Sequence, residues 1–418
     1  MILLATFVLL LVMGVPIGFV LVGTTVAFVL TTGNFALLEA LPQLMFSSLE
    51  VFDLLAIPLF ILLGEIMNDG GVTRRLLEAT RSWVRGLPRS LAYVNLVTNL
   101  LLASILGSAN AQIAIMSRVI VPEMERAGYR RDFATALTAA AGLLGPIVPP
   151  SMVFIIYGVI AQVSIGTLFI AGILPGLILF AVMCTLISFL PAAAEREASG
   201  TVASRRAATR DVLAALAVPA VIVGGILSGA VTPTESAVVA SAIALLVGAF
   251  VYRELRWRHA PDILHRTAAN SAIVMFLIAT AKILGWILTY YQIPQQTADF
   301  MRSLTEDPTV YLLLVFGLLV LVGTVIEGIA ALIILVPILL PVAQGVYGID
   351  PVHFGIVVCL TLILGLLTPP VGTGLYIAAA VTGTDIVRLS RVLVPFLLAT
   401  AAVIVLVVLV PPLVTLRF

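Results

Sequence analysis

A short polar turn, Gly107-Ser108-Ala109-Asn110, stands out in a part of the chain that is otherwise apolar. Apolar arms flank it over residues 91–106 and 113–124, each about 12–16 residues long, whereas a helix needs roughly 20 residues to cross a bilayer. We therefore predict a re-entrant helical hairpin whose tip lies at mid-membrane. Backbone groups without helical partners are tolerated at that depth only where they line a cavity or bind something. The alternative is one long helix over residues 91–124, with small residues at a helix contact.

A second turn of the same kind, Gly323-Thr324, lies between apolar arms over residues 309–322 and 329–343. Glu327 follows it, at a depth where carboxylates are rare and are functional candidates. This carboxylate could complete a cation site, take a proton or accept a hydrogen bond from a substrate hydroxyl. The alternatives are that it reaches water or caps the helix that follows.

Two further segments combine short apolar helices with prolines that interrupt them. Residues 133–141 and 151–161 flank the first break, and residues 352–364 and 375–381 flank the second. Proline removes an amide donor and blocks the helical hydrogen-bond ladder, so both breaks are predicted to be unwound near mid-membrane.

The turns and breaks together offer free carbonyl groups and a few side-chain oxygens. These side chains are Ser108 and Asn110 in the first half, and Thr324, Thr368 and Thr373 in the second. A hard cation such as sodium wants several oxygens, and helix N-termini that face the same space attract an anion. We therefore predict a site for sodium together with an anionic solute; for Ser108 and Asn110 the alternative is hydrogen bonding between packed helices. The candidate substrate-binding residues are Ser108, Asn110, Pro149, Pro150, Glu327, Pro369, Pro370, Gly372 and Thr373.

The composition is that of a polytopic membrane protein: 61% of the residues are hydrophobic, 10% are charged, and the mean hydropathy is +1.20. Soluble domains carry roughly 25% charged residues. Cys184 and Cys359 lie in apolar runs and indicate neither a disulfide framework nor a metal cluster. The sequence contains no nucleophile–base arrangement and no glycine-rich nucleotide loop, which argues against an enzyme and an ATP-driven pump. We expect no cofactor besides coupling sodium ions, and no nucleic-acid partner.

Landmarks recur in the same order in two halves of the chain. Pro16 lies 217 residues before Pro233, Gly107 lies 216 before Gly323, and Pro149 lies 220 before Pro369. The first half has five predicted crossings when hairpins are not counted, and this odd number makes the second half inverted. With the N-terminus outside, 18 of the 22 Lys and Arg residues fall on the cytoplasmic side, as the positive-inside rule requires. The two turns then meet at mid-membrane, where inverted-repeat transporters hold substrate.

The predicted fold is an all-α polytopic membrane protein with two inverted repeats of five crossings each, two re-entrant hairpins and two broken helices. The first repeat covers residues 1–191, with its hairpin at about 91–125 and its broken helix at about 132–162. A cytoplasmic linker covers residues 192–210. The second repeat covers residues 211–418, with its hairpin at about 308–344 and its broken helix at about 352–381.

Three smaller expectations concern the segments around these repeats. Residues 1–13 lack a basic n-region and are predicted to be a first span rather than a leader. Residues 35–52 are predicted to lie along the membrane interface, and residues 72–86 to form an amphipathic surface helix. Lys282 and Glu65, which lie in spans of opposite halves, are predicted to pair at a scaffold contact.

Five motifs are familiar as a set: Gly107-Ser-Ala-Asn110, Pro122-Glu-Met124 before Gly128-Tyr129, Gly145-Pro-Ile-Val-Pro-Pro-Ser151, Thr232-Pro-Thr-Glu235-Ser-Ala and Gly348-Ile-Asp-Pro-Val-His-Phe354-Gly. Together they resemble the large membrane subunit of tripartite ATP-independent periplasmic (TRAP) transporters, nearly end to end. The resemblance implies an ion-transporter-superfamily fold, in which a scaffold domain supports a mobile domain that holds both hairpins. It also implies an elevator mechanism driven by a sodium gradient. The sodium sites that it implies are at Gly107, Ser108, Asn110 and Gly145, and at Gly323, Thr324, Gly365 and Thr368.

The same resemblance implies uptake of an organic acid anion, such as a dicarboxylate or a sialic acid, delivered by a periplasmic substrate-binding protein. A small four-helix membrane subunit completes the scaffold in this family, and this chain is expected to meet it as a separate protein. The implied location is the bacterial inner membrane, surrounded by membrane lipid, with both termini periplasmic. The alternatives are a stand-alone sodium–carboxylate symporter or exchanger of the same superfamily, and a channel or scaffold without coupled transport.

Overall fold

The computed structural model describes residues 2–84, 89–189 and 205–415, and these residues form helices and turns without any β-strand. Five of the described helices are long and apolar enough to cross a membrane, or seven spans result if each of two bent helix pairs counts as one. The five are α11 (Ile165–Phe189), α13 with its π-helical end (Pro233–Val251), η3 with α14 (Trp257–Tyr290), α17 (Gly328–Gly345) and α20 (Ile386–Leu409). The chain is therefore an all-α, multi-pass membrane protein.

The first part of the described chain forms five α-helices before the first hairpin, which starts with α6. They are α1 (Ile2–Val12), α2 (Ile17–Thr32), α3 (Ala36–Ser47), α4 (Ala56–Asp69) and α5 (Val72–Val84). A short 3₁₀ turn, η1 (Phe52–Leu55), leads into α4, and the bend between α3 and the segment that contains α4 is 58°. The pair has the length and composition of one bent span, whereas the interface position of residues 35–52 stays a prediction.

The first turn and the first break follow. Their helices are α6 (Ser90–Leu106), α7 (Ala109–Val119), α8 (Val121–Arg126), α9 (Arg131–Gly142) and α10 (Met152–Ala161). The chain does not continue as one helix over residues 91–124, because α6 ends at a left-handed Gly107 and α7 begins two residues later. Residues 143–151 separate α9 from α10, as the proline pattern predicts.

The second half begins with α12 (Arg205–Leu227), whose first residues lie in the segment predicted as a linker; residues 192–204 of that segment lie outside the described residues. The remaining helices are α13 (Pro233–Leu246), α14 (Ala260–Tyr290), α15 (Ile293–Leu304), α16 (Pro308–Gly323), α18 (Pro351–Gly365), α19 (Thr373–Thr382) and α21 (Pro412–Thr415). Local sequence sets where these helices start. The Thr232 hydroxyl accepts from Glu235 N, and the Glu235 carboxylate accepts from Thr232 N, which is a capping box in front of α13.

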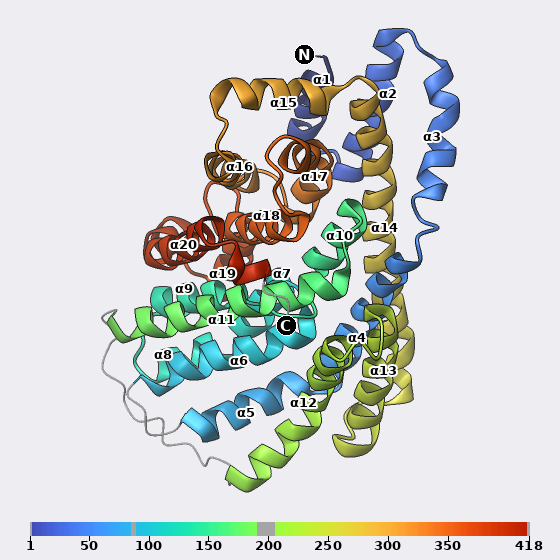
Figure 1. Cartoon of the computed structure of the whole chain (residues 1–418). Coiled ribbons are helices and arrows are strands. Elements are labelled where there is room, and N and C mark those ends of the chain that lie inside the picture. Colours follow the sequence, from blue (N-terminus) through green and yellow to red (C-terminus); the bar gives the residue numbers. More distant parts are fainter. Residues whose placement is uncertain (1, 85–88, 190–204, 416–418) are drawn as a thin grey trace.

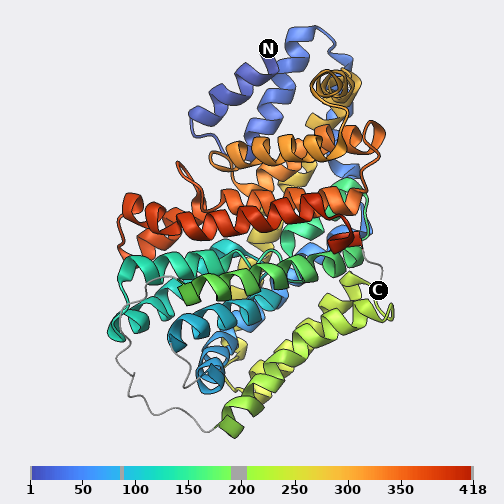
Figure 2. The same cartoon turned by 60° about the vertical axis from the view of Figure 1, so that its left-hand side comes forward.

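The helices form two groups (Figures 1 and 2). The outer helices, which we define as α2, α3, α4, α13 and α14, run along one side of the molecule, with α14 in contact with α2, α3 and α4. The stacked helices, which we define as α6–α11 and α16–α20, lie beside them. Contacts between α14 and α17 and between α4 and α10 join the two groups.

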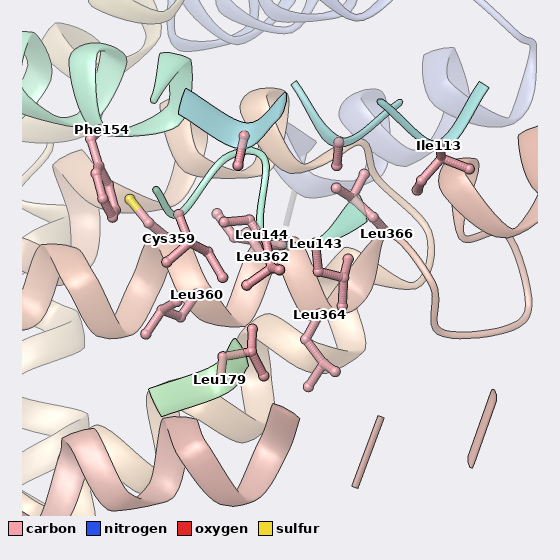
Figure 3. Close-up of a cluster of buried hydrophobic side chains, with 14 of the residues drawn as sticks. Ile113, Leu143, Leu144, Phe154, Leu179, Cys359, Leu360, Leu362, Leu364 and Leu366 are labelled. Atoms are coloured by element: carbon pink, nitrogen blue, oxygen red, sulfur yellow. The ribbon is translucent and has the colours of Figure 1, made fainter. Parts of the chain in front are cut away.

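An apolar core holds the stacked helices together, and both halves of the chain contribute to it (Figure 3). Leu143 and Leu144, from the break between α9 and α10, belong to the same buried cluster as Leu362 of α18. All three side chains are at most 1% exposed. Because close van der Waals packing, rather than removal of apolar surface from water, holds helices together in a bilayer, these contacts pack the first break against a helix of the other half.

Candidate functional site

The first turn joins α6 to α7 at Gly107. This residue has a φ of +58°, a left-handed conformation that favours glycine, and a Cβ there would lie 2.8 Å from the carbonyl oxygen of Pro150. Ser108 caps α7 by accepting a hydrogen bond from the Ala111 amide over 3.5 Å. The turn therefore packs directly on the break that contains Pro150.

The second turn, between α16 and α17, packs on the second break in a similar way. A Cβ added at Gly365 would lie only 2.8 Å from the Cα atom of Gly323. The Val371 amide also donates to the carbonyl oxygen of Thr324 over 3.0 Å. The backbone of this turn is therefore held against the segment that joins α18 to α19.

Glu327 caps α17. One of its carboxylate oxygens accepts hydrogen bonds from the amides of Ile329 and Ala330 over 3.0 and 3.2 Å. Helix capping was one of the alternatives for this residue, and it is confirmed. The side chain is only part-buried, so capping does not remove it from contact with a solute.

A cavity of about 380 Å³ lies between the two turns and the outer helices α4 and α14. Ser108 and Asn110 line it from the first turn, and Glu327 lines it from the second. Glu65 of α4 and Asn270 of α14 line the opposite wall, and no Lys or Arg is among the described residues of the lining. Two turns that are far apart in the sequence therefore share one space.

The predicted residues of each turn come together with those of the adjacent break. A Cβ at Gly145 would lie 3.4 Å from the carbonyl carbon of Ser108, so the first break faces the first turn. Asn110 Nδ2 also donates to Thr373 Oγ1 over 3.5 Å, and this bond joins the first turn to α19 of the other half. Gly323 and Gly365 form the corresponding backbone contact at the second turn.

The other predicted residues are not in the described lining of the cavity, and Pro149 instead lines a small separate pocket against α11 and α12. Thr368 Oγ1 donates to the carbonyl oxygen of Leu364 over 2.9 Å, and Gly372 packs on the Thr368 backbone. Both proline pairs have a cis peptide bond. The predicted residues that are absent from the described lining are Gly145, Pro149, Pro150, Gly323, Thr324, Gly365, Thr368, Pro369, Pro370, Gly372 and Thr373.

One predicted contact is wrong, and two polar residues of the cavity lining, Asn68 and Asn270, were missed. Glu65 pairs with Arg266 over 2.7 Å rather than with Lys282, and Arg266 also binds Asp69 over 2.6 Å. Lys282 is exposed and pairs with no residue in the described ranges. It lies four to five turns, roughly 24 Å, further along α14 than Arg266, and is therefore out of reach of Glu65. Asn270 was missed because its neighbours in the cavity come from other helices.

The comparisons with known proteins agree with this architecture. Residues 4–413 match the family model described as tripartite ATP-independent periplasmic transporter, DctM component. The chain is 38% identical to the sialic acid TRAP transporter large permease protein SiaM of Vibrio cholerae, over 95% of this chain and 93% of that protein. It is 36% identical to the C4-dicarboxylate TRAP transporter large permease protein DctM of Pseudomonas aeruginosa, over 88% and 86%.

A solved structure shares the fold at low sequence identity. The YdaH transporter of Alcanivorax borkumensis superposes with a TM-score of 0.68 and 14% identity, over 90% of this chain and 88% of that one. The predicted family resemblance is thereby confirmed by the family model and by the curated relatives. The chain belongs to the DctM family, the large permease component of tripartite ATP-independent periplasmic transporters, and is a transport protein rather than an enzyme.

Proposed function

We propose that this chain is the large permease of a sodium-coupled importer for an organic acid anion. A periplasmic substrate-binding protein delivers the solute, and a separate small four-helix membrane subunit completes the scaffold in the bacterial inner membrane. The family description names a tripartite periplasmic transporter, and the two relatives are named for sialic acid and for C4-dicarboxylates. The observation that carries the proposal is the cavity that both turns share with α4 and α14.

The proposed architecture is a pair of inverted repeats with both termini periplasmic. The order of elements supports it, because each half runs from a helix pair through a long or bent helix, a short helix, a hairpin and a broken helix to a final long helix. The two short helices, α5 and α15, lie at opposite ends of the molecule (Figure 1). That placement is what an inversion of one half relative to the other predicts.

The proposed mechanism is an elevator movement of the stacked helices along the outer helices. The cavity lies between the two groups, with its turns on the stacked side and with Glu65 and Asn270 on the outer side. A displacement of the stacked helices would carry both turns, and a solute bound to them, past a fixed wall. Exposure of the same site to each side of the membrane in turn is alternating access.

Sodium is proposed to bind at the two turns, with Gly107, Ser108, Asn110 and Gly145 at the first and Gly323, Thr324, Gly365 and Thr368 at the second. Asn110 Oδ1 supports this assignment, because it is buried and has no hydrogen-bond partner among the described residues. A buried acceptor without a donor is costly, and a hard cation is a partner that removes the cost. The solute is proposed to contact Ser108, Asn110 and Glu327, while the proline pairs hold the backbone of the turns.

The proposal is tested by uptake into proteoliposomes that contain the permease and the small subunit, with the binding protein outside. N-acetylneuraminate and succinate serve as radiolabelled probes. We expect uptake of one of them to require an inward sodium gradient and all three proteins. Uptake by this chain alone would support the stand-alone symporter instead. Uptake that is unchanged when potassium replaces sodium would refute the coupling.

A further inference from the structure

Gln112 lies in the first turn of α7, is fully buried and has no role in the sites described so far. Its Nε2 donates to the carbonyl oxygen of Asn99 over 2.7 Å and to Asn99 Oδ1 over 2.8 Å. Its Oε1 has no hydrogen-bond partner among the described residues. A Cβ at Gly145 would lie 2.7 Å from this oxygen, so Oε1 faces the first break where it packs on the first turn.

A chain of buried hydrogen bonds holds the Gln112 amide, and every donor in it points away from the turn. Asn99 Nδ2 donates to the carbonyl oxygen and to Oδ1 of Asn95, over 2.9 and 2.8 Å. Asn95 Nδ2 donates to Thr138 Oγ1 over 2.8 Å, and the Thr138 hydroxyl donates to the carbonyl oxygen of Ala134 over 2.7 Å. The chain therefore ends on a backbone carbonyl at one end and on a free amide oxygen at the other.

The direction of the hydrogen bonds in this chain determines which atom of Gln112 faces the break. If the amide were turned over, Oε1 would lie against two oxygens of Asn99, neither of which can donate. Asn99 cannot turn over in response, because its own Nδ2 already donates to two oxygens of Asn95. The arrangement therefore presents an amide oxygen, and not an amide nitrogen, to Gly145.

We propose that Gln112 Oε1 is a direct ligand of the sodium ion at the first turn, and that Asn99, Asn95 and Thr138 are residues that position it. The inference rests on the sodium coupling proposed above. The carbonyl oxygen of Gly142, which accepts the Gly145 amide over 3.1 Å, lies 3.2 Å from the point that a Cβ at Gly145 would occupy and is a second neutral oxygen there. Neutral oxygens leave the positive charge of the ion uncompensated, and that charge then attracts an anionic solute.

The test is the thermal unfolding of the purified permease in detergent against sodium chloride concentration, with choline chloride keeping the ionic strength constant. A ligand that binds the folded state raises the melting temperature with concentration, which gives the sodium concentration for half-maximal stabilisation. For Gln112→Leu we expect this concentration to rise by on the order of tenfold, and by a smaller factor for Thr138→Val, since removal of residues that orient a ligand weakens metal binding.

Thr80→Val is the matched control. Thr80 is fully buried, and its hydroxyl donates to the carbonyl oxygen four residues earlier over 2.7 Å, as the Thr138 hydroxyl does. Thr80 lies in α5, however, and is not part of the hydrogen-bond chain that ends at Gln112. We expect Thr80→Val to change the melting temperature without sodium and to leave the half-saturating concentration unchanged. If Gln112→Leu does not fold, the sodium concentration for half-maximal stabilisation of Thr138→Val tests the proposal.

Two results would overturn the proposal, and they are distinguishable. In the first, both Gln112→Leu and Thr138→Val have the wild-type sodium concentration for half-maximal stabilisation and differ only in a lower melting temperature without sodium. The hydrogen-bond chain would then have a purely structural role. A wild-type permease that choline stabilises as well as sodium does would refute the sodium sites themselves, before any variant is compared.

Discussion

The contact between Gly323 and Gly365 makes a prediction about the second turn. The change is Gly365→Ala, which adds one methyl group where two backbones meet. Its Cβ would lie 2.8, 2.9 and 3.0 Å from the Cα, C and O atoms of Gly323. Carbon atoms at rest are separated by about 3.5–4.0 Å, so the backbones must move apart by roughly 0.7 Å or more.

The cost follows from the atoms involved. All three are backbone atoms of a turn, so no rotation of a side chain can relieve the overlap. Overpacking of this kind costs about 1–3 kcal/mol, against which alanine gains about 0.5–1 kcal/mol over glycine within a helix. We therefore expect a net loss of stability of about 0.5–2 kcal/mol, together with displacement of the turn that is proposed to bind sodium.

The assay measures both consequences, and Gly317→Ala is the control. Gly317 lies in α16 like Gly323, but a Cβ there would meet nothing within 4 Å. Gly317→Ala should be neutral or stabilising in thermal unfolding, with unchanged sodium dependence. Gly365→Ala should lower the melting temperature by about 0.5–2 °C, since about 1 kcal/mol shifts a cooperative unit of this size by about 1 °C. It should also raise the sodium concentration that half-saturates uptake.

The reasoning would be refuted if both alanine variants behaved alike. Equal stability and equal sodium dependence of Gly365→Ala and Gly317→Ala would mean that the two backbones do not approach as closely as the structure has them. A loss of stability with wild-type sodium dependence would retain the contact and remove the second turn from the cation site.

Three further predictions address individual side chains. Glu327→Ala should destabilise the permease by about 1 kcal/mol through loss of the α17 cap. Glu327→Gln should destabilise it by less, because the glutamine amide oxygen can still accept from the amides of Ile329 and Ala330. Equal stability of the two variants in chemical denaturation would contradict the capping role. Asn110→Ala and Thr368→Ala should each raise the sodium concentration required for uptake while membrane insertion stays intact; unchanged sodium dependence in both would remove them from the sites. Asn110→Cys with Thr373→Cys should be joined by a short bifunctional thiol reagent, since the native side chains approach to 3.5 Å, and failure to cross-link would separate the first turn from α19.

The positions of the helix ends could be predicted from the sequence, because local chemistry determines them. Gly107 ends α6 through its left-handed backbone, and the prolines around Pro149 and Pro369 leave gaps between short helices. Thr232 and Glu235 form the cap that the order of their residue types indicates. Each of these features depends on a few adjacent residues, so an isolated sequence contains the signal.

Contacts that depend on packing between helices could not be predicted. Gln112 and Asn99 are 13 residues apart, and Thr138 comes from a third helix. Asn95 and Asn99 are polar residues in an otherwise apolar arm, but the network that they form, and its direction, require the structure. Glu65 was assigned to Lys282 because both are charged residues of spans, and only the register of α14 against α4 selects Arg266 instead.

The charges around the cavity explain why sodium and solute should bind together on the proposed function. Glu65 and Glu327 line the cavity, and the described lining contains no Lys or Arg. Arg266 is engaged by Glu65 and Asp69, and the amides that begin α17 are taken by Glu327. Two like charges at 4 Å repel by about 4 kcal/mol at an effective dielectric constant of 20, so an organic anion entering this space needs a compensating positive charge. The N-terminus of α7 supplies about half a unit charge, and sodium ions at the two turns would supply the rest. The proposed coupling of the anion to sodium therefore rests on a cavity wall that provides no cationic side chain of its own among the described residues.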